Sequence, residues 1–359
     1  MPRTVVGLDI GSAEIRAVEA KCSGRSVSVH RSGSVALPPG AVEGGLVRDR
    51  AAVTEALRQL WSETKIANRS VRLGVSSGSV LVRQLELDWM PDADLRRSLR
   101  YQVGDLLPVA VEDANLDHVL LGDGEVPGEN GQPRRVVRIL LVATARTAVD
   151  DLVRCVQAAK LQTVAADLAA FALVRVAQRA ARGGAAESEP EAVIDIGVDK
   201  VSVAVHTRGR PHFVRVVPGI GGGLLTRALV EQTGCSWAEA EEFKRTPGVL
   251  ETPDGRPIDR DGAVLVDGVR RMLDELRTTL DFHAQSDPET APTRATLTGQ
   301  GALMPGLVDR CAATLGIPVR LLDAGAALTP RGPGQADPAG PTLGQGMSVP
   351  LGLCLGLAS

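Results

Sequence analysis

Two aspartates, far apart in this chain, each lie between an apolar run and a glycine turn. The first is in VVGLDIGSAEIRAV, from Val5 to Val18, and the second is in VIDIGVDKVSVAV, over residues 193–205. Each segment is typical of a β-hairpin whose first strand ends in a carboxylate, Asp9 or Asp195. Two such hairpins in one chain predict two similar halves that face each other.

The turns of these hairpins have the chemistry of a phosphate site. Backbone N–H groups in a tight glycine turn form a cradle for an anion, and the missing side chain lets the anion come close. A carboxylate at the end of the adjoining strand can hold a hydrated Mg²⁺, which a nucleoside triphosphate brings with it. A third glycine segment, Gly299-Gln300-Gly301, precedes an expected helix and suits a flat base or a ribose. We therefore expect two turns that clamp a polyphosphate and a third loop near the nucleoside.

Two other nucleotide motifs are missing or incomplete. A P-loop needs a glycine followed by lysine and then by serine or threonine, and no lysine in this chain follows a glycine. The dinucleotide fingerprint G-x-G-x-x-G begins at Gly219 and Gly221, but residue 224 is a leucine. That loop also follows a hairpin instead of a parallel strand, so the pattern argues against a dinucleotide-binding fold.

Composition narrows the class of protein further. The chain has 359 residues, which favours two lobes, and 44% of them are hydrophobic. A net charge of -3, with dispersed Lys and Arg and only 2% aromatic residues, gives no case for nucleic-acid binding. The five cysteines are scattered without a Cys-x-x-Cys pair, so zinc and a disulfide framework are not expected. No apolar run approaches the ~20 residues of a spanning helix, so we expect no direct membrane insertion.

The first half of the chain is expected to form a β-sheet with helices and one insert. Residues 92–107 have a helical apolar stripe that follows Pro91 and precedes Pro108, and strands are expected at 117–121 and 136–143. We therefore predict a small α+β subdomain inserted at 88–150. The remaining expected elements are strands at 26–35, 71–75, 80–87 and 164–167 and helices at 49–64, 147–160 and 169–181.

The second half repeats the order of a hairpin followed by helices and strands. Ser236 and Glu239 have the spacing of a capping box at the start of a helix. The fold class that we predict is α/β, with two lobes of mixed β-sheet flanked by helices. The predicted limits are 1–87 and 151–185 for the first lobe, 88–150 for the insert, 186–345 for the second lobe with a helical subdomain at about 222–292, and 346–359 for a closing helix that returns to the first lobe.

The segments GLDIGSAEIRAV, AVIDIGVDKVSVAV and LTGQGALMPGL, in this order and spacing, resemble the three nucleotide motifs of the actin-like ATPase superfamily. Within it the chain most resembles the PilM family of type IV pilus assembly, and next the related FtsA family. MPDADLRRSLRYQVGDLLPVAVEDANLDHVLL is similar to the PilM pattern of a Met-Pro helix start, a helix that ends in Leu-Pro and an Asp-His strand. VAADLAAFALVRVA, DELRTTLDFHAQS and PLGLCLGLA resemble further PilM elements, so the resemblance covers essentially the whole chain.

The resemblance implies an ATP–Mg²⁺ site between the two halves. It assigns Asp9, Gly11 and Ser12 to the first phosphate loop and Asp195 and Gly197 to the second, with both aspartates holding Mg²⁺ through water. The remaining implied cofactor-binding residues are Arg16 in place of a usual Lys, the pair Gly221 and Gly222 near ribose or phosphate, Glu241 and Lys244 beside the nucleoside, and Gly299 and Gly301 of the adenosine motif.

Three positions bear on catalysis. Val201 stands where relatives usually have Thr, so a hydroxyl is lost there. Asp199 is a second acid near the second phosphate loop, where it would repel an unscreened anion. We therefore expect nucleotide binding with weak or no hydrolysis. Asp167, at a strand end after the insert, is our candidate catalytic residue for polarising an attacking water.

The function that the resemblance implies is a cytoplasmic component of the inner-membrane assembly platform of the type IV pilus or of a related type II secretion system. The insert and the adjoining first lobe would receive the cytoplasmic N-terminal tail of a PilN-like bitopic protein, with ATP as a conformational clamp. The chain would be peripheral to the inner membrane through this partner, and self-association is an additional option.

Several alternatives remain open at this point. An FtsA-like division protein would carry a C-terminal amphipathic membrane helix, whereas this chain ends in LGLAS. A small-molecule kinase of the same superfamily gives no reason for the insert. A scaffold with a dead nucleotide site is the third alternative. At single positions the aspartates could cap hairpins, Glu241 and Lys244 could form a solvated helix pair, and the stripe at 92–107 could be core instead of a docking groove.

Overall fold

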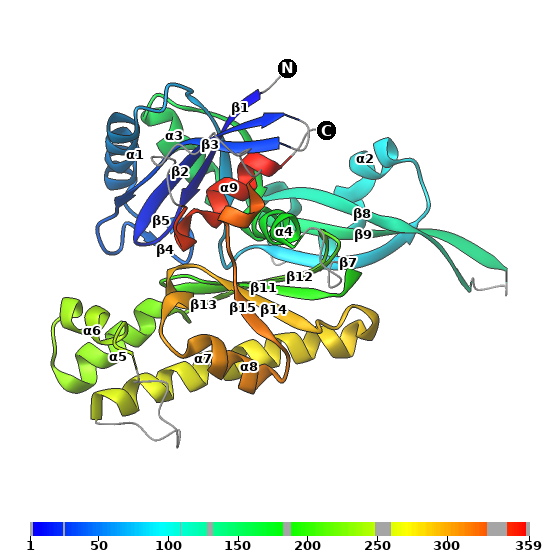
Figure 1. The fold of residues 1–359 in the computed structure, drawn as a ribbon. Helices are drawn as coiled ribbons and strands as arrows, with labels where there is room; N and C mark the ends of the chain where they lie inside the picture. Colours follow the sequence, from blue (N-terminus) through cyan, green and yellow to red (C-terminus); the bar gives the residue numbers. More distant parts are fainter. Residues whose placement is uncertain are drawn as a thin grey trace.

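Two five-stranded sheets with the same strand order form the frame of the molecule (Figure 1). The computed structural model describes residues 3–23, 26–107, 109–127, 132–181, 188–247, 260–328 and 343–356. In each sheet three consecutive strands form an antiparallel meander. A later strand pairs in parallel with the first strand of the meander, and one further strand pairs in parallel with that later strand. The duplication that the two hairpins predicted is therefore a duplication of whole sheets.

The first-lobe sheet has the order β10-β6-β1-β2-β3. Two helices cover one of its faces, where the buried residues Leu57, Leu60 and Val156 contact the strands. Asp49 caps the first helix, because its carboxylate accepts a hydrogen bond from the backbone N–H of Ala52 at 2.9 Å. The elements are β1 (Arg3–Ile10), β2 (Glu14–Ser23), β3 (Ser26–Ala36), the short hairpin β4 (Val42–Glu43) and β5 (Leu46–Val47), α1 (Arg50–Thr64), β6 (Ser70–Val75), α3 (Arg146–Ala158) and β10 (Gln162–Leu168).

The second-lobe sheet has the order β13-β12-β11-β14-β15. The predicted capping box is confirmed, since the Ser236 hydroxyl accepts from the N–H of Glu239 and the Glu239 carboxylate accepts from the N–H of Ser236. The elements are β11 (Glu191–Ile196), β12 (Lys200–Thr207), β13 (Arg210–Pro218), α5 (Gly222–Thr233), α6 (Trp237–Phe243), α7 (Arg260–Ser286), β14 (Arg294–Thr298), α8 (Leu307–Leu315) and β15 (Val319–Leu321).

Two helices, α4 (Ala169–Ala180) and α9 (Ser348–Leu355), lie between the two sheets (Figure 1). The approach of α9 is so close that a Cβ atom on Gly7 would lie 1.9 Å from the carbonyl oxygen of Pro350. A Cβ atom on Gly352 would lie 2.0 Å from the carbonyl oxygen of Ala172. Glycines at these positions therefore allow the last helix to pack against the first strand and against α4.

A three-stranded sheet of order β7-β9-β8 makes up the insert, together with α2. Its strands are β7 (Leu81–Asp88), β8 (Ala114–Pro127) and β9 (Pro133–Ala145), and α2 spans Asp92–Gln102. The sequence places residues 80–87 in the first-lobe sheet, and this prediction is wrong, since β7 pairs with β9. An alternating pattern identifies a strand without identifying its partner. The helix expected to reach residue 107 ends at Gln102, and Gly104, a poor helix former, begins a 3₁₀ turn.

The predicted limit between residues 185 and 186 lies outside the described residues, as do residues 329–342 of the predicted second lobe. In the described part of the chain, no helix is long and apolar enough to cross a membrane.

Candidate functional site

The glycine turns after β1 and β11 have the same backbone geometry. The N–H of Gly11 donates to the carbonyl of Glu14 at 3.0 Å, and the N–H of Gly197 donates to the carbonyl of Lys200 at 3.1 Å. A Cβ atom on either glycine would lie 3.0 Å from that carbonyl oxygen. We call the turn at residues 9–16 the first jaw and the turn at residues 195–202 the second jaw.

An ion cluster fills the first jaw. Arg16 Nη1 lies 3.2 Å from Asp9 Oδ2, and Arg16 Nε donates to Glu14 Oε1 at 2.8 Å. Burial opposes the charge on Arg16, but Asp9 and Glu14 outweigh it and raise the pKa of the guanidinium. The hydroxyl oxygen of Ser12 is buried in the same turn and has no hydrogen-bond partner among the described residues. The first jaw thus offers a fixed cation and an unused buried hydroxyl.

The surroundings of Asp195 in the second jaw disfavour the charged form of its carboxylate. Burial and the nearby Asp9 carboxylate raise the pKa of Asp195 from 3.8 to about 6, against the opposing influence of Arg16 and Lys200. The two predicted metal-binding aspartates are therefore close enough to repel each other. A divalent cation between them would relieve this repulsion.

Several hydrogen bonds join the lobes around the jaws. Gln300 Nε2 donates to Glu14 Oε1 at 2.7 Å, which ties the Gly299-Gln300-Gly301 loop to the first jaw. The N–H of Gly44 donates to Asp199 Oδ2 at 2.5 Å. The expected repulsion from Asp199 is therefore reduced, since its carboxylate already accepts a hydrogen bond from the β4–β5 turn.

Four of the glycines predicted to bind the cofactor pack against the second jaw. The N–H of Gly222 donates to the carbonyl of Gly197 at 2.9 Å. Gly221 has φ 147°, and a Cβ atom there would lie 2.7 Å from the same carbonyl oxygen. Gly299 has φ 85°, and its Cβ atom would lie 2.5 Å from Asp195 Oδ1, while one on Gly301 would lie 2.5 Å from Ile196 Cγ2. Four of the predicted glycines are therefore brought together on the second jaw.

Glu241 and Lys244 form a buried network at the base of α5. Lys244 Nζ donates to Glu241 Oε1 at 2.8 Å, to Thr226 Oγ1 at 2.7 Å and to the carbonyl of Gly222 at 2.9 Å. Burial lowers the pKa of Lys244. Burial also opposes the charge on Glu241, but hydrogen bonds from Lys244 and Thr226 lower its pKa. The alternative of a solvated helix pair is therefore wrong for Lys244, which is buried. Contact of this pair with a nucleoside stays a prediction.

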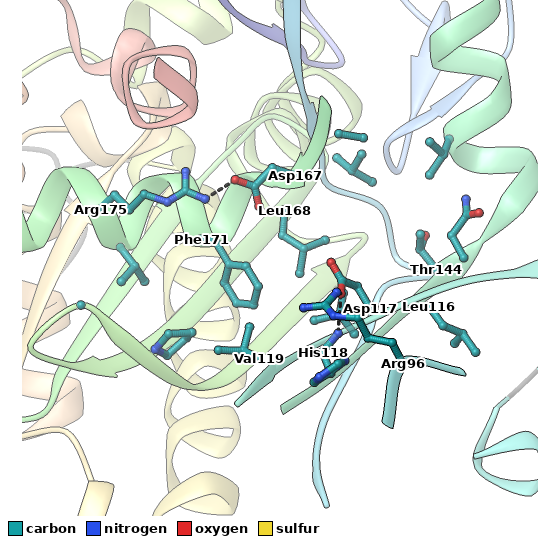
Figure 2. A pocket seen from close by; sticks show the side chains of 18 of the residues that line it. Arg96, Leu116, Asp117, His118, Val119, Thr144, Asp167, Leu168, Phe171 and Arg175 are labelled. Atoms are coloured by element: carbon teal, nitrogen blue, oxygen red, sulfur yellow. Dashed lines mark hydrogen bonds and ion pairs between the residues drawn. The ribbon is translucent and has the colours of Figure 1, made fainter. Parts of the chain in front are cut away.

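Asp167, the candidate catalytic residue, lies in a cavity outside the two jaws. It is at the end of β10, two strands from β1 in the sheet order, and it forms an ion pair with Arg175 of α4. Both residues line a cavity of about 830 Å³, in which Figure 2 shows the Asp167–Arg175 pair. The role of Asp167 in polarising a water molecule stays a prediction.

The cavity, which we call the β8–β10 pocket, lies between the terminal strands of two sheets. β8 is the last strand of the inserted sheet and contributes residues 115–119, and β10 is the last strand of the first-lobe sheet and contributes residues 166–168. Figure 2 shows Phe171 and Leu168 on one side, opposite Val119 and Leu116. Its polar side chains include Asn115, Asp117, His118, Thr144 and Arg96.

Sequence reasoning missed Glu14, Gln300 and Arg175. Glu14 and Arg16 are two apart on β2 and therefore share a face of the strand, which is a signal that could have identified their pairing. The contact between Glu14 and Gln300 joins residues 286 positions apart, and no local pattern announces it. The same holds for Arg175, whose interaction with Asp167 depends on how α4 packs.

Comparison with known proteins gives one family and several similar structures. The family model described as type IV pilus assembly protein PilM matches residues 7–333. A structure of a PilM–PilN type IV pilus biogenesis complex is 24% identical, with a TM-score of 0.81, over 98% of this chain and 97% of that chain. The ethanolamine utilization protein EutJ of Carboxydothermus hydrogenoformans is 17% identical, with a TM-score of 0.51, over 99% and 90% of the two chains. MreB5 of Spiroplasma citri bound to ADP is 14% identical, with a TM-score of 0.50, over 89% and 92%.

These likenesses confirm the predicted actin-like fold class, with two lobes of mixed sheet. The family model extends from the first jaw to beyond the Gly299-Gln300-Gly301 loop, so it covers both lobes and the insert, and it decides between the PilM and FtsA alternatives. This chain belongs to the PilM family of type IV pilus assembly proteins.

Proposed function

We propose that this chain binds ATP with Mg²⁺ between its two lobes and docks the cytoplasmic N-terminal tail of a PilN-like membrane protein. In this role it is a peripheral component of the pilus assembly platform on the cytoplasmic side of the inner membrane. The observation that carries the nucleotide proposal is the pair of jaws: two glycine turns with equivalent backbone hydrogen bonds, whose carboxylates are close enough for Asp9 to raise the pKa of Asp195.

The residues of the jaws fit ATP and Mg²⁺. The buried Ser12 hydroxyl lacks a partner and could donate to a phosphate oxygen, and Arg16 supplies a cation beside it. Asp9 and Asp195 would hold the water shell of the metal, and the metal would neutralise charge on the phosphates and on both carboxylates. The glycines that close over the second jaw would let the nucleoside approach the backbone of the loops.

The β8–β10 pocket is the site that we propose for the tail. Its volume of about 830 Å³ suits a short peptide segment, and apolar side chains line both of its sides. A terminal strand presents backbone N–H and C=O groups that an extended peptide can pair with, while side-chain pockets select the sequence. A similar protein was solved as a PilM–PilN complex, which supports a PilN-like tail as the occupant.

Titration calorimetry with ATP and Mg²⁺ tests the nucleotide site. We expect saturable binding by the parent protein, and at least tenfold weaker binding by Asp9→Ala and by Asp195→Ala, since each loses a charged contact worth about 1.5–3 kcal/mol. A phosphate-release assay on the same samples measures turnover. A parent protein that docks the tail but binds no ATP would be the nucleotide-dead scaffold instead.

A matched pair of substitutions tests the tail site. Val119→Arg places a long cation in the β8–β10 pocket, whereas Leu120→Arg changes the next residue, which is exposed and points to the other face of β8. We expect Val119→Arg to abolish binding of a synthetic tail peptide and Leu120→Arg to leave it unchanged. Equal binding by the two variants would place the tail elsewhere.

A further inference from the structure

One carboxylate oxygen in the first jaw accepts hydrogen bonds from both lobes. Glu14 Oε1 accepts from Arg16 Nε at 2.8 Å and from Gln300 Nε2 at 2.7 Å, and Arg16 Nη2 lies 2.7 Å from the same oxygen. Both charged side chains are mostly buried, with exposed fractions of 18% for Glu14 and 16% for Arg16. The backbone carbonyl of Glu14 also accepts from the N–H of Gly11. An internal anion therefore lies within the turn that we propose for phosphate.

The donors around this oxygen are of the kind that binds a phosphate. A guanidinium presents its N–H groups as a rigid fork, which matches the oxygens of a carboxylate and those of a phosphate. The side-chain amide of Gln300 adds a neutral donor from the second lobe. Charge-assisted hydrogen bonds are about twice as strong as neutral ones. The carboxylate of Glu14 and a phosphate oxygen of a nucleotide would therefore compete for the same donors.

The guanidinium of Arg16 is already engaged on its Nε–Nη2 edge. Nε and Nη2 contact Glu14, and Nη1 lies 3.2 Å from Asp9 Oδ2. Gly346 packs directly against the guanidinium, since a Cβ atom on Gly346 would lie 2.8 Å from Arg16 Nε. A phosphate can therefore take the Nε–Nη2 edge only when the carboxylate of Glu14 leaves it.

Of the two carboxylates on Arg16, that of Glu14 is the one able to leave. Glu14 is the first residue of β2, beside the turn, and its side chain has one more rotatable bond than that of Asp9. Asp9 lies inside β1, directly opposite Arg16 in the hairpin register. In the proposed site Asp9 would hold the water shell of Mg²⁺, whereas the charge of Glu14 would repel the phosphates.

We propose that Glu14 is a carboxylate latch: without nucleotide it occupies the position of a phosphate oxygen in the first jaw, and ATP–Mg²⁺ must displace it from Arg16 and Gln300. This inference rests on the proposed function and adds to that site a residue that weakens nucleotide binding. The apparent affinity of a ligand falls in proportion to the fraction of molecules whose site is competent to bind it. Loss of the Glu14 carboxylate should therefore tighten ATP binding, whereas loss of Asp9 or Asp195 weakens it.

Titration calorimetry with ATP–Mg²⁺ tests the sign of this effect. We expect Glu14→Ala to bind at least about fivefold more tightly than the parent, which corresponds to a latch that is open in fewer than about one molecule in five. Glu14→Gln keeps the shape of the side chain without its charge, and we expect it to bind more tightly than the parent as well. Equal or weaker binding by both variants would make Glu14 a supporting acceptor for Arg16 and would overturn the proposal.

Glu43→Ala is the matched control. Glu43 is an exposed acid of the first lobe that lies 3.8 Å from Arg48, and it precedes Gly44, whose N–H contacts the second jaw. The variant removes an equal charge near the cleft without changing the latch, so we expect ATP affinity within about twofold of the parent. An equal gain in Glu43→Ala would mean that the loss of any nearby negative charge favours ATP, and would also overturn the proposal.

Hydrogen exchange of the nucleotide-free protein gives a second readout. Because the latch holds Gln300 in the parent, we expect the backbone amides at 300–303 to exchange faster in Glu14→Ala and at the parental rate in Glu43→Ala. Unchanged exchange in Glu14→Ala would contradict the latch. Absence of ATP binding in the parent and in both Glu14 variants contradicts the proposed function itself, whereas binding without a gain in those variants contradicts only this inference.

Discussion

The two jaws have equivalent backbone turns, but different side chains occupy the corresponding positions. The hairpin registers pair Asp9 with Arg16 and Asp195 with Ser202, and the turn hydrogen bonds make Glu14 equivalent to Lys200. In the first jaw the position opposite the aspartate is a cation that neutralises it. In the second jaw the corresponding residue is Ser202, whose Oγ lies 3.3 Å from Oγ of Ser76 in the other lobe.

Because of this difference, the two halves contribute different interactions to the site. The first jaw carries the ionic cluster, and its guanidinium also acts on the second aspartate across the lobes. The second jaw carries an aspartate of raised pKa and two contacts with the first lobe, one made by Asp199 and one by Ser202. A duplicated fold can thus keep the turn geometry, which needs glycine, and vary the side chains that give each turn its charge.

The loops beside the jaws show the same contrast. β6 pairs in parallel with β1 and leads into Ser76-Ser77-Gly78, and β14 pairs in parallel with β11 and leads into Gly299-Gln300-Gly301. Of these two loops, only Gly299-Gln300-Gly301 packs its glycines closely against the neighbouring jaw. The evidence is that a Cβ atom on Gly299 would lie 2.5 Å from Asp195 Oδ1.

The largest effect is expected from Gly299→Ala. The added Cβ atom would require a φ of 85° and would collide with Asp195, so we expect the free energy of unfolding to fall by about 3 kcal/mol. Chemical denaturation measures this loss. The matched variant in the first lobe is Gly78→Ala, where a Cβ atom would contact the ring of Pro218, with Cγ nearest at 3.2 Å, and we expect a change below about 1 kcal/mol. Equal losses would mean that the two loops are equivalent after all.

The next effect concerns pH and Asp195. Because the pKa of this carboxyl is raised from 3.8 to about 6, the folded state binds the proton more tightly than the unfolded state between these values. The free energy of unfolding should therefore decrease as the pH rises from about 4 to about 6, by about 2 kcal/mol in the metal-free protein.

Two variants isolate this slope. Asp195→Asn removes the titrating group and should flatten the curve in that window. Asp9→Asn removes the neighbouring charge that raises the pKa of Asp195, so it should move the slope to lower pH. Denaturation measured across the pH range distinguishes them, and an unchanged slope in Asp195→Asn would assign the titration to another group.

A smaller effect is expected from Arg16→Gln. The variant leaves Asp9 and Glu14 without their shared cation, so we expect a loss of about 1.5 kcal/mol in stability and about tenfold weaker ATP binding. Lys200→Gln removes the cation of the second jaw, whose Nζ lies 3.9 Å from Asp199 Oδ1, and should change both quantities much less. A reversed order would mean that the second jaw holds the phosphates.

The features that sequence predicted are those with local causes. The hairpins around Asp9 and Asp195 follow from alternation and a glycine turn, and the capping box at Ser236 follows from a spacing of three residues. Repetition of the Asp-Ile-Gly segment predicted the two halves, since equal local patterns favour equal local structure.

The features that sequence missed depend on packing between distant segments. β7 alternates as any strand does, and only the structure shows that β9 is its partner. Asp167 occupies a strand end, as Asp9 does, but β10 is the edge strand of its sheet, and so Asp167 faces the β8–β10 pocket and Arg175. A strand's place within a sheet is decided by the order of pairing, which no residue in the strand itself encodes.

The smallest effect is expected from Ser202→Ala. Its hydroxyl contributes one hydrogen bond between lobes, to Ser76, so we expect a loss of about 0.5–1 kcal/mol in stability. A double-mutant cycle with Ser76→Ala measures the coupling between the two hydroxyls, and Ser34→Ala, at an exposed position of β3, is the control. Because Ser202 stands opposite Asp195 as Arg16 stands opposite Asp9, its effect on ATP affinity tests the division of work directly. A hydroxyl that only joins the lobes changes ATP affinity no more than Ser76→Ala does, whereas a larger loss from Ser202→Ala alone would make it a phosphate contact and the second jaw a full counterpart of the first.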